Sequence, residues 1–114
     1  MKSTAILSML GISQRARKLI SGQDTVARAC DSGKVFLIIL ACDTSENTRK
    51  KITSLCCRKN IPLFFWGHSD ELGRAIGKGQ RKVIGITDRG IAKKIIKHLN
   101  LLTGVGDIDE TTRI

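Results

Sequence analysis

The chain has 114 residues, a length that suits one domain and is short for two. Twenty Lys and Arg residues stand against ten Asp and Glu residues, and the formal net charge of +10 favours polyanionic partners. With 41% apolar residues the composition excludes a disordered basic tail, and the longest apolar run, residues 35–42, is too short to cross a bilayer.

The first third of the sequence predicts two helices. Apolar positions recur at helical spacing over residues 4–20, and the basic residues that follow the first apolar stretch argue against a signal peptide. The next four residues suggest a capping box, with Ser21 as the N-cap and Asp24 reaching back to it. A short second helix is therefore expected to reach Ser32, with Gly33 closing it.

The rest of the chain alternates strands with helices. Strands are predicted at residues 35–41, 63–66 and 82–87, and the first of these is apolar enough to be covered on both faces. Helices are predicted at residues 43–59, at residues 68–76 and from Asp88 onward. Helices between buried strands indicate the α/β class and a three-layer α/β/α sandwich formed by residues 1–103. Residues 104–114 form an acidic stretch without a clear period and are expected to be a flexible tail.

Candidate catalytic and metal-binding motifs all have a simpler structural interpretation. Residues 73–79 are similar to a P-loop, but the spacing is one residue short and Gly79 stands where Ser or Thr would bind magnesium. Asp43 and Asp88 follow strands and precede helices, where N-capping is the more frequent role. The two histidines lie near predicted helix ends. The sequence therefore predicts neither an enzyme nor a cofactor or metal site.

The four cysteines, Cys30, Cys42, Cys56 and Cys57, lie in apolar surroundings and lack the paired C-x-x-C spacing of a zinc site. We expect them to be buried or half-buried thiols of a cytoplasmic protein, without a disulfide role.

Basic residues form three groups that are expected to converge on one surface. They are Arg15, Arg17 and Lys18 at the end of the first helix, Arg28 in the second helix, and Lys78, Arg81 and Lys82 in a flexible loop before the last strand. The low aromatic content, 4% with no Tyr, argues against a base-stacking platform and favours contacts to phosphate. This pattern predicts nucleic-acid binding, although for any single lysine a solvated surface position is the alternative.

Three motifs occur in a distinctive order: KLISG at residues 18–22, SENTRKK at residues 45–51 and ELGRAIGK at residues 71–78. With the strand between the first two, they make the chain resemble the ribosomal L7Ae family of kink-turn RNA-binding proteins, and within it the small bacterial YlxQ-like branch. The resemblance covers about residues 7–99. It implies a four-stranded mixed sheet whose first short strand lies near residues 18–21.

The resemblance also implies an RNA-binding surface. In the family, the start of the second helix enters the widened groove beside tandem sheared G·A pairs, and the loop after the fourth helix covers looped-out nucleotides. The matching helix positions are Gly22, Gln23, Asp24, Thr25 and Arg28, and the matching loop positions are Lys78, Gly79, Gln80, Arg81, Lys82 and Val83.

Elementary chemistry agrees with this assignment. Gly22 lets backbone approach RNA closely, and the helix N-terminus presents amide groups to phosphate. Asp24 and Thr25 can accept hydrogen bonds from guanine amino groups, and Arg28 can pair with phosphate or guanine. Archaeal and eukaryotic members carry Asn-Glu in place of Asp24 and Thr25, and their loop is less basic. A more general affinity for structured RNA, and a purely helix-capping role for Asp24, are therefore open alternatives.

These observations predict a monomeric, non-enzymatic protein that recognises and stabilises kink-turn-like RNA, associated with ribosomal RNA or other structured RNA and with no membrane partner. The alternative is a ribosome-assembly or translation accessory protein that acts mainly through contacts with ribosomal proteins. The sandwich also resembles the substrate-binding domain of some RNA methyltransferases, but the chain has no room for their catalytic domain.

Overall fold

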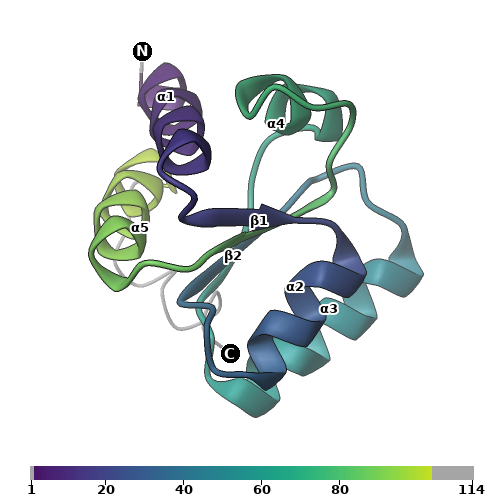
Figure 1. Cartoon of the computed structure of the whole chain (residues 1–114). Coiled ribbons are helices and arrows are strands. Elements are labelled where there is room, and N and C mark those ends of the chain that lie inside the picture. Colours follow the sequence, from purple (N-terminus) through teal and green to yellow (C-terminus); the bar gives the residue numbers. More distant parts are fainter. Residues whose placement is uncertain (1, 104–114) are drawn as a thin grey trace.

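The computed structural model describes residues 2–103, in which helices and strands alternate (Figure 1). The elements are α1 (Lys2–Arg15), β1 (Leu19–Ser21), α2 (Gln23–Asp31), β2 (Leu37–Leu40), α3 (Glu46–Lys59), β3 (Leu63–Phe65), α4 (Ser69–Ala75), β4 (Val83–Ile86) and α5 (Arg89–Thr103). The acidic tail predicted at residues 104–114 lies outside the described residues.

The four strands form one mixed sheet in the order β1-β4-β2-β3. β4 pairs antiparallel with both β1 and β2, whereas β2 and β3 are parallel. Helices α1, α4 and α5 cover one face of the sheet, and α2 and α3 cover the other (Figure 1). The predicted three-layer α/β/α sandwich is confirmed, and so is the four-stranded mixed sheet that the resemblance implied.

Each face of the sheet has its own hydrophobic core. Side chains alternate along β2, so Leu37 and Ile39 pack under α1, α4 and α5, while Ile38 and Leu40 pack under α2 and α3. Every residue of β2 and β4 is buried, as a strand covered on both faces requires. A Cβ added to Gly85 in β4 would lie 3.4 Å from the side chain of Val26 in α2. The missing side chain therefore lets α2 pack closely on the sheet.

The first helix is shorter than the predicted residues 4–20. α1 ends at Arg15, and the backbone then turns through Arg17, whose φ of 61° is left-handed. Leu19 and Ile20 belong to β1 and pack against opposite faces of the sheet. Two adjacent apolar residues fit a helix and a doubly covered strand equally well, which explains the error. The short strand that the resemblance implied near residues 18–21 is confirmed.

The other elements lie close to their predicted positions. Ser45 caps α3, and its Oγ accepts a hydrogen bond from the Thr48 amide at 3.2 Å. Asp88 caps α5 as predicted, because its Oδ2 accepts from the Ile91 amide at 2.8 Å. Asn60 ends α3 in the left-handed conformation.

The expectation of buried or half-buried thiols holds for Cys30 and Cys56 and is wrong for Cys42 and Cys57, which are exposed. Cys57 follows Cys56 on α3, where successive side chains point about 100° apart, so burying one turns the other toward solvent. Burial raises the pKa of the Cys30 thiol to about 11 and that of Cys56 to about 12.

Candidate nucleic-acid interface

The junction between β1 and α2 depends on the backbone of Gly22. This residue is the N-cap of α2 and has φ 100° and ψ 139°, a conformation that L side chains rarely adopt. Its amide donates to the carbonyl oxygen of Val83 at 2.9 Å, and its carbonyl oxygen accepts from the amide of Val26 at 3.0 Å. The first bond joins the start of α2 to the end of the basic loop.

The predicted capping box at Ser21 and Asp24 is wrong. Ser21 is the last residue of β1, and its Oγ accepts a hydrogen bond from Nε of Arg81 at 3.0 Å. Among the described residues, no side chain caps the N-terminus of α2. Its first-turn amides therefore lack the side-chain acceptor that most helices provide, and Asp24 is an exposed carboxylate without a capping role.

The basic loop after α4 is held against that helix by backbone hydrogen bonds. The Lys78 amide donates to the carbonyl oxygen of Gly73 at 2.8 Å, and the Arg81 amide donates to that of Ser69 at 3.0 Å. At the far end, the carbonyl oxygen of Lys82 accepts from the Ala41 amide at 2.8 Å. These bonds fix the path of a loop that the sequence predicts to be flexible.

The two predicted halves of the site meet in one hollow of about 370 Å³. Residues Ser21, Gly22 and Gln23 line one side, and residues 80–83 line the other. The side chain of Val83 is 1% exposed and belongs to the core, so this residue contributes its carbonyl oxygen to the junction. Gln80 in this lining is exposed, and so are Lys78 and Gly79 earlier in the same loop.

The start of α3 adds a third element that the site prediction did not include. Thr48 also lines the hollow, and its hydroxyl donates to Oε1 of Gln23 at 3.1 Å. The Ser45 hydroxyl in turn donates to Oγ1 of Thr48 at 3.1 Å. These contacts orient the Gln23 side chain at the mouth of the site. The SENTRKK motif at residues 45–51 contains Thr48. In the sequence it supported the family resemblance, but it did not indicate that Thr48 contacts Gln23.

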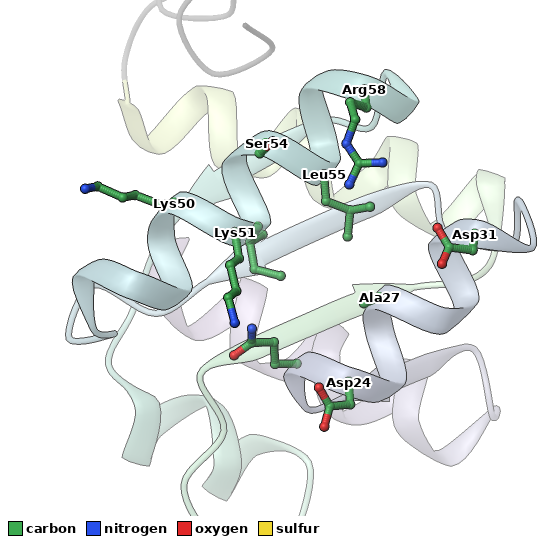
Figure 2. A pocket seen from close by; sticks show the side chains of 10 residues that line it. Asp24, Ala27, Asp31, Lys50, Lys51, Ser54, Leu55 and Arg58 are labelled. Atoms are coloured by element: carbon green, nitrogen blue, oxygen red, sulfur yellow. The ribbon is translucent and has the colours of Figure 1, made fainter.

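The remaining helix positions lie on the exposed side of α2. Asp24, Thr25 and Arg28 are all exposed, and Arg28 lies one turn farther along the helix from Asp24. Asp24 also borders a groove between α2 and α3 (Figure 2). Arg28 therefore extends the site along α2, outside the hollow itself.

The basic group at the end of α1 does not join this site, contrary to the expectation that three groups converge. The carbonyl oxygen of its last member, Lys18, accepts a hydrogen bond from the Thr87 amide at 2.9 Å, at the opposite end of β1 from Gly22. β1 is paired antiparallel with β4 and is extended, with a rise of about 3.3 Å per residue. Lys18 and Gly22, which flank β1, are therefore held apart. Only the start of α2 and the loop before β4 form the predicted surface.

A family model for the ribosomal protein L7Ae/L30e/S12e/Gadd45 family matches residues 4–96. The chain belongs to this family. The RNA-binding protein YlxQ of Bacillus subtilis (strain 168) is 39% identical over 92 residues, which cover 81% of this chain and 92% of that protein. The RNA-binding protein YlxQ of Enterococcus faecium is 36% identical over 88 residues, covering 77% of this chain and 84% of its own length.

Two solved structures share the fold of this chain. A protein of unknown function from Bacillus halodurans C superimposes with a TM-score of 0.81 at 40% identity, over 83% of this chain and 96% of that one. The Giardia lamblia 15.5kD RNA binding protein gives a TM-score of 0.74 at 21% identity and covers 89% of each chain. The second match shows the shared fold alone.

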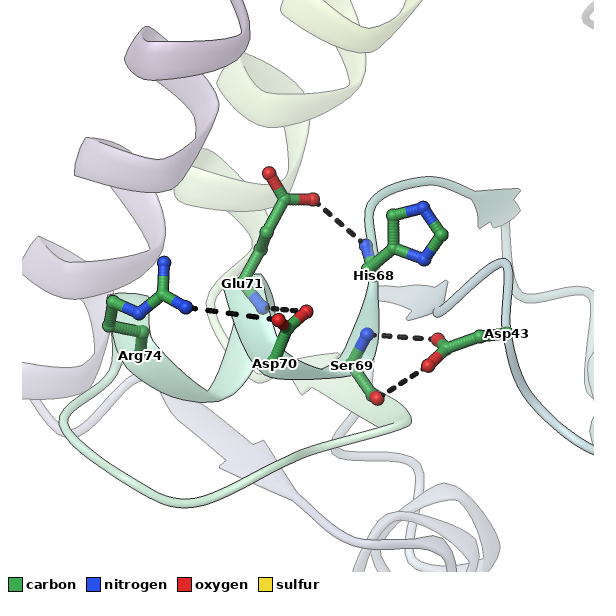
Figure 3. A network of polar contacts seen from close by, with 6 residues as sticks. All are labelled: Asp43, His68, Ser69, Asp70, Glu71 and Arg74. Carbon is green, nitrogen blue, oxygen red and sulfur yellow. Dashed lines mark hydrogen bonds and ion pairs between the residues drawn. The ribbon is translucent and has the colours of Figure 1, made fainter.

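In this L7Ae-family chain, the polar groups most similar to a catalytic set stabilise the start of α4 (Figure 3). Oδ1 of Asp43 accepts from the Ser69 amide at 2.9 Å, and Oδ2 accepts from the Ser69 hydroxyl at 2.6 Å. The same two hydrogen bonds hold the pKa of Asp43 below its ordinary value. Glu71 accepts from the His68 amide at 3.1 Å, which closes the first turn. Ser69 is 1% exposed and both Asp43 oxygens accept hydrogen bonds from it, so these groups hold the start of α4 in place.

Asp43 thus caps α4, whereas its position in the sequence suggested a cap for the helix that follows it. In the part of the chain that the structure describes, no three His, Cys, Asp or Glu side chains are grouped to hold a metal ion. Within residues 2–103, no helix combines the length and the apolar character needed to cross a membrane.

Proposed function

We propose that this protein is a non-enzymatic RNA-binding protein that recognises and stabilises kink-turn-like structured RNA, associated with the ribosome in the cytoplasm. The observation that carries the proposal is the hydrogen bond from the Gly22 amide to the Val83 carbonyl oxygen, which joins the uncapped start of α2 to the basic loop. Two relatives at 39% and 36% identity are named RNA-binding proteins, which supports RNA as the partner.

The chemistry of the hollow suits a distorted RNA groove. Uncapped amides at the start of α2 favour an anionic phosphate, and Gln23, Asp24 and Thr48 offer acceptors and donors to base edges. A regular RNA helix hides its major groove from side chains, whereas a kinked internal loop widens it enough for a helix end to enter. Lys82 lines the same hollow and Lys78 is exposed earlier in the loop, and both can contact phosphates near the kink.

The proposal is tested by titrating the protein with a kink-turn RNA and with an uninterrupted duplex of the same length. We expect tighter binding to the kink-turn, and a footprint of about five phosphates gives a slope of roughly −4 for log affinity against log salt. Equal affinities for the two RNAs would contradict kink-turn recognition. An affinity that does not change with salt would indicate that the protein acts through protein partners.

A further inference from the structure

The exposed side of α3 carries a row of polar and basic side chains that the candidate interface does not use. Lys50, Ser54 and Arg58 recur every four residues, so they lie above one another along two turns of the helix, a length of about 12 Å. All three line a groove of about 560 Å³ on the α2 side and a second hollow of similar volume on the other side of α3. We call these three residues the α3 ridge.

Positive charge dominates the α3 side of the groove. Neither ion pair found in residues 2–103, Lys59 with Asp31 and Arg74 with Asp70, includes a residue of the α3 ridge. Next to the ridge, Lys51 lines the groove on the α2 side. Arg49 lines the second hollow on the other side, and its guanidinium carbon lies 4.4 Å from the centroid of the Phe65 ring. Lys50 and Arg58 are exposed. Neither of them forms an ion pair with an acidic side chain in residues 2–103.

Acidic groups lie along the edges of this surface. Asp24 and Asp31 on α2 border the groove, and Glu46 borders the second hollow. A polyanion is therefore repelled by the α2 side of the groove and attracted by the crest of α3.

The start of α3 links the candidate interface to the α3 ridge, with Lys50 pointing away from α2 (Figure 2). Thr48 precedes the ridge on α3 and is hydrogen bonded to Gln23 in the predicted site. In Figure 2, Lys51 reaches from α3 toward the start of α2, where Asp24 lies, while Arg58 lies at the opposite end of the groove. An elongated ligand that leaves the hollow beside Gln23 can therefore continue along the crest of α3, past Lys50, Ser54 and Arg58.

We propose that the α3 ridge binds the phosphate backbone of an RNA helix that extends from the RNA bound at the candidate interface. This inference rests on the proposed function. Lys50 and Arg58 supply charge, and the hydroxyl of Ser54 between them can donate to a phosphate oxygen. The ridge is roughly 12 Å long, so Lys50 and Arg58 can contact different phosphates of one strand. Backbone contacts of this kind are independent of base sequence.

The test compares two kink-turn RNAs, one with long flanking stems and one trimmed to the shortest stems that keep the kink. The variant is Lys50→Ala with Arg58→Ala. The control is Lys93→Ala with Lys97→Ala, which removes the same number of exposed cations from α5, on the other face of the sheet, although these two lie one turn apart and not two. The charge-preserving exchange Lys50→Arg with Arg58→Lys and thermal unfolding of each variant separate lost contacts from lost stability.

For the long-stemmed RNA, we expect the α3 variant to bind about tenfold more weakly and to reduce the salt slope by about 1 to 2, because two phosphate contacts are lost. The trimmed RNA should lose less than about twofold, and the charge-preserving exchange should bind like the wild type. Equal losses of RNA affinity in the α3 and α5 variants, or equal losses for the two RNAs, would overturn this inference and leave the proposed function untouched. Wild-type protein that binds neither RNA would overturn the proposed function itself and the inference with it.

Discussion

Replacing Gly73 with Ala should displace the basic loop from α4 and weaken RNA binding. A Cβ on Gly73 would lie 1.8 Å from the carbonyl oxygen of Gly79 and 2.6 Å from its carbonyl carbon. The loop would have to move from 1.8 Å to at least 3.4 Å, a shift of about 1.6 Å, to restore an ordinary contact. Both contacting atoms belong to backbone, so no side-chain rotation relieves the overlap.

The displacement acts on hydrogen bonds that fix the loop. The Lys78 amide bonds to Gly73 itself, and the Arg81 amide bonds to Ser69 one turn earlier in α4. Overpacking together with strain in these bonds should cost about 1 to 3 kcal/mol of unfolding free energy. Because Arg81 and Lys82 line the hollow, we also expect about a tenfold loss of kink-turn affinity, equivalent to about 1.4 kcal/mol.

Gly79→Ala is the matched control. It makes the same chemical change in the same loop, but no heavy atom lies within 4 Å of a Cβ built there. Thermal unfolding should therefore separate Gly73→Ala from both the wild type and Gly79→Ala, and titration with kink-turn RNA should separate Gly73→Ala from the wild type. A Gly73→Ala protein that melts and binds like the wild type would refute the close approach of loop and helix.

Three further predictions concern single side chains. Arg28→Ala should cost about 1 to 3 kcal/mol of binding free energy on a kink-turn and narrow the preference over duplex RNA; an unchanged preference in parallel titrations would place Arg28 outside the interface. The pKa of Asp43 is lower in the folded protein than its ordinary value of 3.8, so its contribution to stability is present at neutral pH and is lost as the pH falls below 3.8. The wild type should consequently lose stability relative to Asp43→Asn in this acidic range, and acid-unfolding curves that stay parallel would contradict the bonds to Ser69. At pH 8 a thiol reagent should label the exposed Cys42 and Cys57 rapidly. The buried thiols of Cys30 and Cys56, with pKa values of about 11 and about 12, should be labelled only when the protein unfolds. Equal labelling rates for all four thiols would argue against the burial of Cys30 and Cys56.

Local sequence signals were sufficient for most of the sandwich. The apolar run around β2 predicted a strand covered on both faces, and Asp88 marked the start of α5 correctly. These signals depend on neighbouring residues, so one chain contains all the information they need. The start of α2 and the loop before β4 were also predicted to lie together, and they do. That pairing came from the family resemblance and not from local sequence signals.

Features set by contacts between distant residues were missed. Ser21 has the composition of an N-cap, yet its hydroxyl bonds to Arg81, sixty positions later. Asp43 bonds to Ser69 in the same way and caps a helix other than the next one. The register of β1 against β4 places Lys18 and Gly22 at opposite ends of a strand, which separates two basic groups that are close in sequence. Periodicity and capping rules carry no information about these pairings.

The surface that RNA contacts can be mapped by NMR. A kink-turn RNA is added to labelled protein, and amide shifts are followed residue by residue. We expect the largest changes at residues 22–28 and 78–83, with further changes at Thr48 and none on the exposed side of α5. Changes concentrated on Lys93 and Lys97, or around Arg17 and Lys18, would show that RNA binds a different surface and would contradict the proposed interface.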